Sequence, residues 1–137
     1  MTYLLDTSFI INYFKKGCDW AQDLVRLTES KGNQLAISVI TYGELCYGVT
    51  RSVNPEKEQE KIEGFLNDFL VEIKPVTTQV VLKYAKLKRE AELGGFPLDD
   101  FDLLIGATAV IGETRLVTDN KKHFSKICES ILWNTTL

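Results

Sequence analysis

Short apolar runs alternate with longer segments of helical period along almost the whole chain, and this alternation most constrains the fold. The runs are too short for buried helices and read as strands. Helical segments separate them, which is the pattern of parallel strands joined by crossover helices. The sequence therefore predicts an α/β fold, with a central parallel sheet of four to five strands covered by helices on both faces. We expect the strands at residues 2–5, 35–39, 70–73 and 115–118, with a possible fifth at 131–133.

The helical segments carry residues that favour helix boundaries. Ser38 or Thr41 can cap the helix that follows the second strand. Pro55 suits the first position of the next helix, because its missing N–H would have no partner there. Thr77 can cap a long helix, and Asp99 begins another. These residues predict where the covering helices start.

Length and composition restrict the class of protein. The chain has 137 residues, of which 45% are hydrophobic and 26% charged, as in one folded domain spanning residues 1–137. Its apolar runs are too short to cross a membrane, and its first residues do not resemble a secretory signal, so we expect a cytoplasmic protein. Three widely spaced cysteines argue against a zinc cage or a disulfide framework.

The formal net charge of -3 argues against a protein that coats nucleic acid, because such proteins are usually basic. It leaves room for an enzyme whose acids are gathered in one pocket and neutralised by metal ions. The positions of the acids therefore matter more than their number.

Four acids occupy similar structural places. Asp6 directly follows the first strand and Asp119 the fourth. Glu44 lies early in the helix after the second strand, and Asp102 in the first turn of the helix after Pro97. Ligands of open parallel sheets bind outside the carboxyl ends of the strands, so these acids can meet there.

Such a cluster has a chemical rationale. Carboxylates packed together repel one another and need compensation. Hard oxygen ligands suit Mg²⁺ or Mn²⁺, which also bind substrate phosphates. These ions activate water and stabilise the leaving oxygen, so the cluster predicts phosphodiester hydrolysis.

Each acid also has a purely structural interpretation. Asp6 can cap the helix that follows it, and Asp119 can lie in a turn. Asp99 and Asp102 can form a capping box. Glu44 is harder to explain in this way, because its neighbours are largely apolar and an unpaired buried charge is costly.

At this point the chain resembles the PIN-domain family, and more narrowly the VapC-type toxins of toxin–antitoxin pairs. The resemblance covers nearly the whole chain and lies in the order and spacing of four pieces. These are Leu4-Leu5-Asp6-Thr7-Ser8, the stretch from Ser38 to Gly48, the stretch from Gly95 to Ala107, and Leu116-Val117-Thr118-Asp119-Asn120 followed by Phe124.

The resemblance implies roles for these residues. Asp6, Glu44 and Asp102 match the metal-site acids of the family, and Asp119 matches a more variable fourth position. Asp99 and Asp100 are extra acids in this stretch, so three acids are candidates for the third metal ligand. Asp102 is favoured because it directly precedes the Leu-Leu-Ile run, and Asp99 is interpreted as a cap that also supports the site. The polar residues that match supporting positions are Thr7, Ser8 and Thr118, although position 8 most often carries Asn in the family.

The resemblance further implies a PIN-like three-layer fold and an endoribonuclease dependent on Mg²⁺ or Mn²⁺. It implies a homodimer and inhibition by a VapB-type antitoxin, whose C-terminal segment lies along a groove and can place an arginine among the acids. Basic residues near the proposed rim can hold RNA phosphates. The candidates are Lys15, Lys16, Arg51, Arg115, Lys121 and Lys122.

Three alternatives stay open beside this hypothesis. A phosphatase with an aspartyl nucleophile needs a second Asp two residues after the first, and Ser8 stands there instead. A PIN nuclease that is not a toxin would keep the same acids. A catalytically inactive PIN domain would act as a binding module, but the joint presence of Asp6, Glu44 and Asp102 argues against decay.

Overall fold

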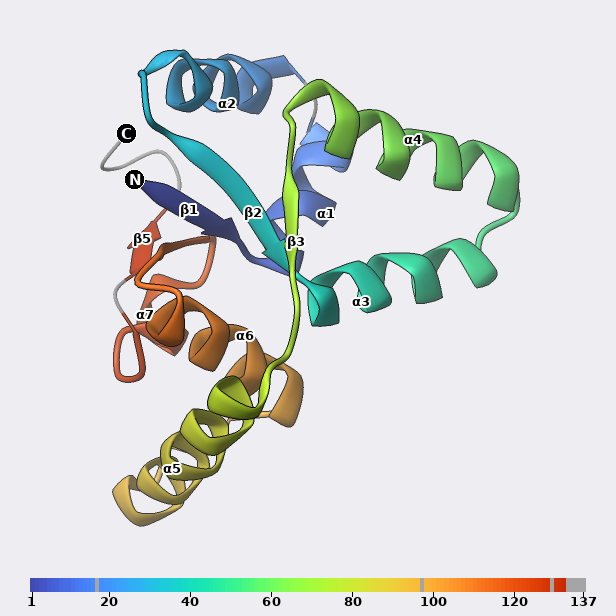
Figure 1. Ribbon diagram of the computed structural model, residues 1–137. Coiled ribbons are helices and arrows are strands. Elements are labelled where there is room, and N and C mark those ends of the chain that lie inside the picture. The colour runs from blue at the N-terminus through green and yellow to red at the C-terminus, as the bar shows by residue number, and fades with distance from the viewer. Residues whose placement is uncertain (17, 97, 129, 133–137) are drawn as a thin grey trace.

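The computed structural model describes residues 1–16, 18–96, 98–128 and 130–132. A parallel sheet in the order β3-β2-β1-β4-β5 crosses the molecule (Figure 1). Its strands are β1 (Thr2–Leu5), β2 (Gln34–Ser38), β3 (Glu72–Lys74), β4 (Arg115–Thr118) and β5 (Ser130–Leu132). The predicted α/β fold and its possible fifth strand are thus confirmed, although Trp133 lies outside the described residues. Strand β3 begins later than predicted, because Leu70 turns the chain with a left-handed φ of 51°.

The helices lie between the strands as the alternation predicts. They are α1 (Thr7–Lys16), α2 (Cys18–Glu29), α3 (Val39–Thr50), α4 (Pro55–Asp68), α5 (Thr78–Gly94), α6 (Asp100–Ile111) and α7 (Lys121–Phe124). Ser38, Thr77 and Asp99 cap α3, α5 and α6 through their side-chain oxygens. Pro55 stands in the first turn of α4. The predicted helix starts are therefore confirmed.

The sheet separates two apolar cores, which makes the fold three-layered. Neighbouring residues of β1 point to opposite faces, so Leu4 and Leu5 belong to different cores. Residues of α1, α2, α3 and α4 pack with Leu5, whereas residues of α5, α6 and α7 pack with Leu4. Each face of the sheet is thus covered, as an all-parallel sheet requires.

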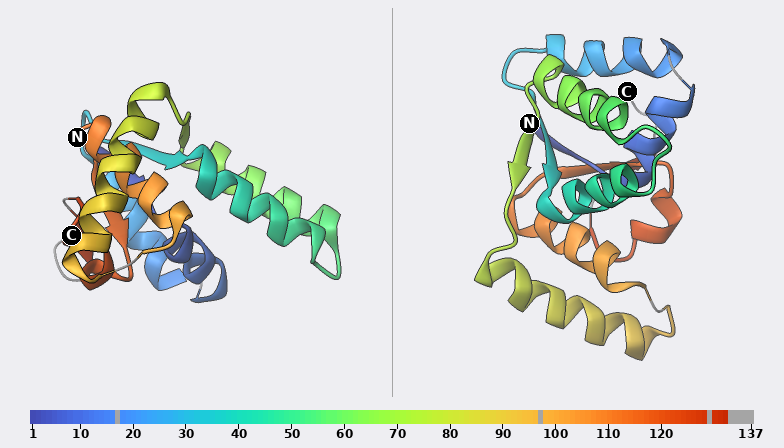
Figure 2. Two further views of the ribbon diagram at one scale, coloured as in Figure 1. Left: turned by 90° about the horizontal axis from the view of Figure 1, so that it is seen from below. Right: turned by 90° about the vertical axis from the view of Figure 1, so that its right-hand side faces the viewer.

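Helices α3 and α4 run side by side away from the sheet and form an arm (Figure 2). At its base, Phe65 of α4 and the cap residue Phe69 that follows α4 pack against Tyr13 of α1, with ring centroids 5.2 and 6.3 Å apart. This contact fixes the arm relative to α1, which directly follows Asp6. Within the described ranges, no helix is long and apolar enough to cross a membrane.

A glycine in α6 allows the segment after α7 to pack closely. A Cβ atom at Gly106 would lie 2.6 Å from Cδ1 of Ile127, which is closer than carbon atoms can approach. Ile127 and Phe124 are both buried in the core with α6. The close approach brings α7 next to the first turn of α6, where Asp102 lies.

Candidate active site

Three of the predicted acids line one pocket at the carboxyl edge of the sheet. Asp6 directly follows β1, Glu44 lies in α3, and Asp102 lies in the first turn of α6. The pocket has a volume of about 280 Å³. Its other lining residues are Thr7, Ser8, Ile11, Asn120, His123 and Phe124. The topology thus brings together acids that lie far apart in the sequence.

Asp6 is the most buried of these acids, with 4% of its surface exposed. Its Oδ2 accepts hydrogen bonds of 2.8 Å from the hydroxyls of Ser8 and Thr118. Thr118 is fully buried, and its hydroxyl also accepts a bond from the backbone N–H of Asn120. Two hydroxyl groups therefore fix the Asp6 carboxylate, which is consistent with the supporting positions predicted for Ser8 and Thr118.

Glu44 is held by a pair of threonines. The Thr7 hydroxyl lies 2.7 Å from Glu44 Oε1 and 2.9 Å from the Thr41 hydroxyl. A hydroxyl has one proton, so Thr7 donates to the carboxylate and accepts from Thr41 when Glu44 is ionised. Burial raises the pKa of Glu44, the Thr7 bond works against this rise, and the charges of Asp99 and Asp6 add to it.

Asp102 contacts the only histidine of the chain. Its Oδ2 lies 3.0 Å from Nε2 of His123, and since an ionised carboxylate only accepts, the Nε2–H group donates. Burial raises the pKa of Asp102 to about 6. The hydrogen bond from His123 opposes that rise, and the negative charges of Asp99 and Asp6 add to it. The pocket therefore holds acids whose negative charges repel one another.

The structure gives different partners to the three neighbouring acids at the start of α6. Asp99 Oδ1 accepts a 3.0 Å bond from the backbone N–H of Asp102, so Asp99 is the predicted cap. Asp100 points to α5, where it pairs with Lys88 at 2.8 Å and accepts a bond from Tyr84. Only Asp102 of the three lines the pocket.

Asp119, the fourth predicted acid, lies beside the pocket but does not line it. The side-chain amide of Asn12 in α1 donates to its Oδ2. The next residue, Asn120, contributes to the pocket wall instead. The hydrogen bond from Asn12 thus holds Asp119 against α1. The structure supports Asp119 as a metal ligand less strongly than it supports the three acids that line the pocket.

The basic residues predicted at the rim lie in different places. Lys15 lines a groove beside the pocket. Arg51 lies exposed at the far end of α3, with its guanidinium 5.6 Å from the centre of the Tyr47 ring. The side chains of Lys16 and Lys121 lie outside the described part of the structure. Lys122 lines a pocket that adjoins the acidic one.

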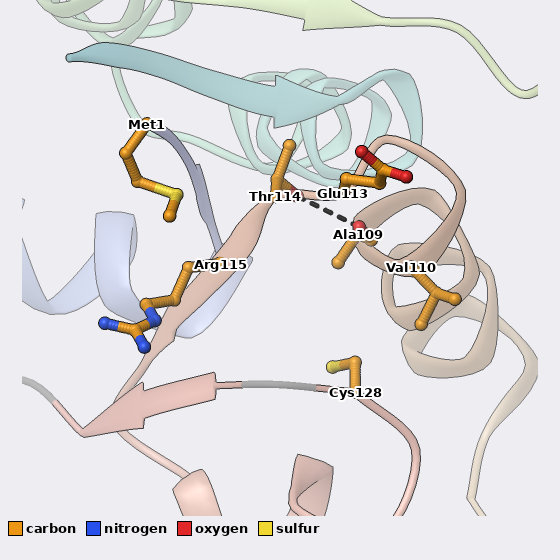
Figure 3. A pocket seen from close by; sticks show the side chains of 7 residues that line it. All are labelled: Met1, Ala109, Val110, Glu113, Thr114, Arg115 and Cys128. Carbon is orange, nitrogen blue, oxygen red and sulfur yellow. Dashed lines mark hydrogen bonds between the residues drawn. The ribbon is translucent and has the colours of Figure 1, made fainter. Parts of the chain in front are cut away.

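The prediction that Arg115 lies near the rim of the acidic pocket is wrong. Arg115 begins β4 and lines a pocket at the amino ends of the strands, together with Met1, Thr114 and Cys128 (Figure 3). The whole length of β4 separates Arg115 from Asp119. Four residue steps of 3.3 Å each give a distance of about 13 Å along the strand. Arg115 therefore cannot belong to the rim of the acidic pocket.

Sequence reasoning did not find three polar residues of the site. Asn12 bonds Asp119, His123 bonds Asp102, and Thr41 bonds the Thr7 hydroxyl that holds Glu44. A helical signal exists for two of them. Asn12 lies four residues after Ser8, and Thr41 lies three residues before Glu44, so each pair shares a helix face. The contact between His123 and Asp102 depends on the packing of α7 on α6 and has no local signal.

The donor set of the pocket fits a hard divalent cation. Its carboxylates are oxygen ligands. Burial and, to a smaller extent, mutual repulsion raise the pKa values of Glu44 and Asp102, and a cation would oppose both effects. Among the described residues, no three His, Cys, Asp or Glu side chains already lie close enough to hold a metal ion. The acids surround the pocket without meeting at one point. Mg²⁺ tolerates this arrangement because it keeps several of its waters.

The fold is an α/β domain with an acidic pocket at the carboxyl edge of its parallel sheet. The acids come from the residue after β1, from α3 and from α6. The family model of the PIN domain matches residues 3–130, and the chain belongs to this family. It is 35% identical over 134 residues to ribonuclease VapC2 of Rickettsia felis, with 98% of both chains covered. It is 35% identical over 126 residues to ribonuclease VapC1 of Methanocaldococcus jannaschii, covering 92% of this chain and 81% of that protein.

Solved structures are similar as well. The crystal structure of VapBC2 from Rickettsia felis, bound to a DNA fragment from their promoter, matches with a TM-score of 0.89 and 32% identity. The match covers 98% of this chain and 100% of that chain. The predicted membership of the PIN-domain family is therefore confirmed.

Proposed function

We propose that this chain, as a single PIN domain, is an endoribonuclease that hydrolyses RNA with Mg²⁺ or Mn²⁺. It acts as the toxin of a toxin–antitoxin pair. The observation that carries the proposal is the convergence of Asp6, Glu44 and Asp102 on one pocket. Relatives that are 35% identical over most of this chain bear the name ribonuclease, which supports RNA as the substrate.

The three acids are the catalytic residues in this proposal, and they would hold the divalent ion, with Asp119 as an outlying fourth acid. When bound, the ion supplies Lewis acidity at the scissile phosphate. The remaining residues position the acids. Ser8 and Thr118 orient Asp6, Thr7 orients Glu44, and His123 orients Asp102. Asp99 supports the site by fixing the first turn of α6.

The decisive experiment is cleavage of total RNA by the purified protein, with and without Mg²⁺ or Mn²⁺. We expect cleavage only with the ion, and loss of cleavage in Asp6→Ala and in Asp102→Ala. Circular dichroism of both variants shows whether they remain folded. If two folded variants cleave as well as the parent, the site is assigned wrongly.

The proposed partner is a VapB-type antitoxin, and a groove beside the acids supports this proposal. The groove has a volume of about 460 Å³ and runs between α1, α3 and α4. Its apolar lining residues are Ile11, Phe14, Leu45, Val49 and Ile62. Ile11 lines both the groove and the acidic pocket, so a peptide in the groove can extend to the acids. An arginine at its end would neutralise them.

Expression in a host tests the toxin proposal separately from the nuclease proposal. We expect growth arrest on expression of the parent, and relief when the gene product encoded beside it is expressed with it. A cytoplasmic location follows from the proposed RNA substrate. The proposed homodimer is tested by the molar mass in solution. Growth that is unaffected without any partner would remove the toxin proposal while leaving the nuclease proposal intact.

A further inference from the structure

A second pocket shares a wall with the acidic pocket. It has a volume of about 320 Å³. Its lining residues are Phe96, Leu98, Asn120, Lys122, His123 and Lys126. Asn120 and His123 line the acidic pocket too, so the two hollows lie on either side of these residues. A ligand that extends past this shared wall therefore reaches both pockets.

The second pocket is basic although the chain is acidic overall. Lys122 and Lys126 are both exposed. Among the described residues, neither ammonium group forms a salt bridge with a carboxylate. Two cations without a carboxylate partner therefore stand next to a cluster of mutually repelling acids. This contrast in charge matches a ligand that carries several phosphates, one of which lies at the acids.

Lys126 is held in place before any ligand arrives. Its ammonium lies 4.6 Å from the centre of the Phe96 ring. Phe96 is itself fixed, because its backbone N–H donates to Ala91 O at the end of α5. A Cβ atom at Gly94 would lie 2.3 Å from the Phe96 ring, so only glycine leaves room for the ring there. A cation that is already ordered loses less side-chain entropy when it binds a phosphate.

We propose that this second pocket, called here the lysine pocket, binds the phosphate of a nucleotide that flanks the scissile bond of a single-stranded RNA. The inference rests on the proposed function, since the acidic pocket must hold the scissile phosphate. Lys122 and Lys126 contact the flanking phosphate, and Phe96 positions Lys126. Asn120 Oδ1 accepts a 3.3 Å hydrogen bond from the backbone N–H of His123. The side-chain N–H groups of Asn120 therefore remain as donors for the RNA.

Single-stranded RNA is favoured over an acidic peptide as the occupant because the wall is shared. A peptide carboxylate would satisfy the two lysines equally well, but it would have no reason to lie beside the acids. A polynucleotide has a second phosphate one residue along the same strand. Phosphate contacts of this kind position a substrate without reading its sequence.

The test compares Lys122→Ala/Lys126→Ala with Lys83→Ala/Lys86→Ala. Lys83 and Lys86 line a hollow on α5 with Leu82 and Ile111, so the control removes the same charge from a similar surface that shares no residue with the acidic pocket. Binding of a fluorescein-labelled single-stranded RNA is measured by anisotropy in EDTA over a range of NaCl concentrations. A gel verifies that the RNA stays intact.

We expect the variant of the lysine pocket to bind about tenfold more weakly at low salt. The slope of log K against log salt should fall by about 0.7, the value for one phosphate contact on a single strand. The control should change the affinity and the slope much less. Lys126→Arg should keep the binding of the parent, and Phe96→Leu should lose about threefold, because an arginine keeps the contact with the ring and a leucine removes it.

Equal affinities of the two double variants would overturn the proposal, whether or not the pocket takes an acidic peptide. Cleavage by the parent, measured beside the binding, separates this failure from that of the proposed function. If the parent cleaves RNA and the lysine-pocket variant binds as tightly as the control, only the present inference is wrong. A parent that neither binds nor cleaves RNA overturns both.

Discussion

Two pockets of nearly equal size lie at opposite ends of β4, and they differ in chemistry. The acidic pocket, of about 280 Å³, lies at the carboxyl ends of the strands and is lined by Asp6, Glu44 and Asp102. The amino-end pocket, of about 270 Å³, holds one acid, Glu113, together with Arg115 and Cys128 (Figure 3). Size therefore does not distinguish a candidate active site. The direction of the strands does, because helices that leave their carboxyl ends bring polar residues to one edge.

The two pockets also differ in how they affect stability. Burial and repulsion raise the pKa values of Asp102 and Glu44, so the ionised acids cost free energy in the folded protein. In the amino-end pocket, burial raises the pKa of the Cys128 thiol to about 12, which leaves the thiol neutral at physiological pH. The acidic pocket thus carries an electrostatic cost at neutral pH that the amino-end pocket does not.

The largest expected difference comes from the same substitution in both pockets. Glu44→Gln should lower RNA cleavage by more than about 100-fold, because loss of a group that merely supports a metal ligand already costs 10–100-fold. Glu113→Gln removes a carboxylate from the amino-end pocket and should leave cleavage unchanged. Initial rates at a fixed Mn²⁺ concentration measure both effects. Equal losses in the two variants would show that the acidic pocket is not the active site.

A second pair of variants exchanges a buried threonine for valine at each end of β4. Thr118→Val removes the hydroxyl that holds Asp6, and we expect a loss of about 10–100-fold in Mn²⁺ affinity and cleavage. Thr114→Val removes a bond to Ala109 O in the other pocket and should lower only the free energy of unfolding, by about 1 kcal/mol. Calorimetric titration with Mn²⁺ and urea unfolding separate the two effects. A Thr118→Val protein that binds Mn²⁺ like the parent would contradict the role given to Thr118.

The sequence predicts more of the fold than of the candidate active site. Caps such as Thr77 and Asp99 act within three residues, so the sequence alone indicated them. The partner of Asp100 depends on which side of α6 faces α5, and that packing leaves no local signal. The prediction that Arg115 lies near the rim is wrong, because the extended strand β4 places Arg115 and Asp119 at opposite ends of the sheet.

The free energy of unfolding of the metal-free parent should depend on pH through Asp102, and that of Asp102→Asn should lack this contribution. The pKa of Asp102 is raised from 3.8 to about 6, so between these values the folded protein binds more protons than the unfolded chain. Stability of the metal-free parent therefore falls as pH rises from about 4 to about 6. Asp102→Asn removes this contribution and should be more stable than the parent at pH 7.5, by about 1–2 kcal/mol after allowance for solvent screening.

Urea unfolding of both proteins in EDTA at pH 4 and at pH 7.5 measures this difference. The gain of Asp102→Asn should appear at pH 7.5 and disappear at pH 4, while its cleavage activity is lost. A variant that is less stable than the parent at pH 7.5 would show that Asp102 stabilises the fold. In that case the ionised Asp102 carboxylate would carry no electrostatic cost that a cation could remove.

The smallest expected effect lies in the amino-end pocket, where stability can rise without a loss of function. Glu113 has a left-handed φ of 53°, which costs a residue other than glycine or asparagine about 1–2 kcal/mol. Glu113→Asn should therefore raise the free energy of unfolding by about 0.5–1 kcal/mol, since asparagine tolerates this conformation. Its RNA cleavage should equal that of the parent, in contrast to Asp102→Asn, which gains stability and loses activity. If Glu113→Asn also loses activity, the two ends of β4 are coupled, and the separation between a functional and a structural end of the sheet fails.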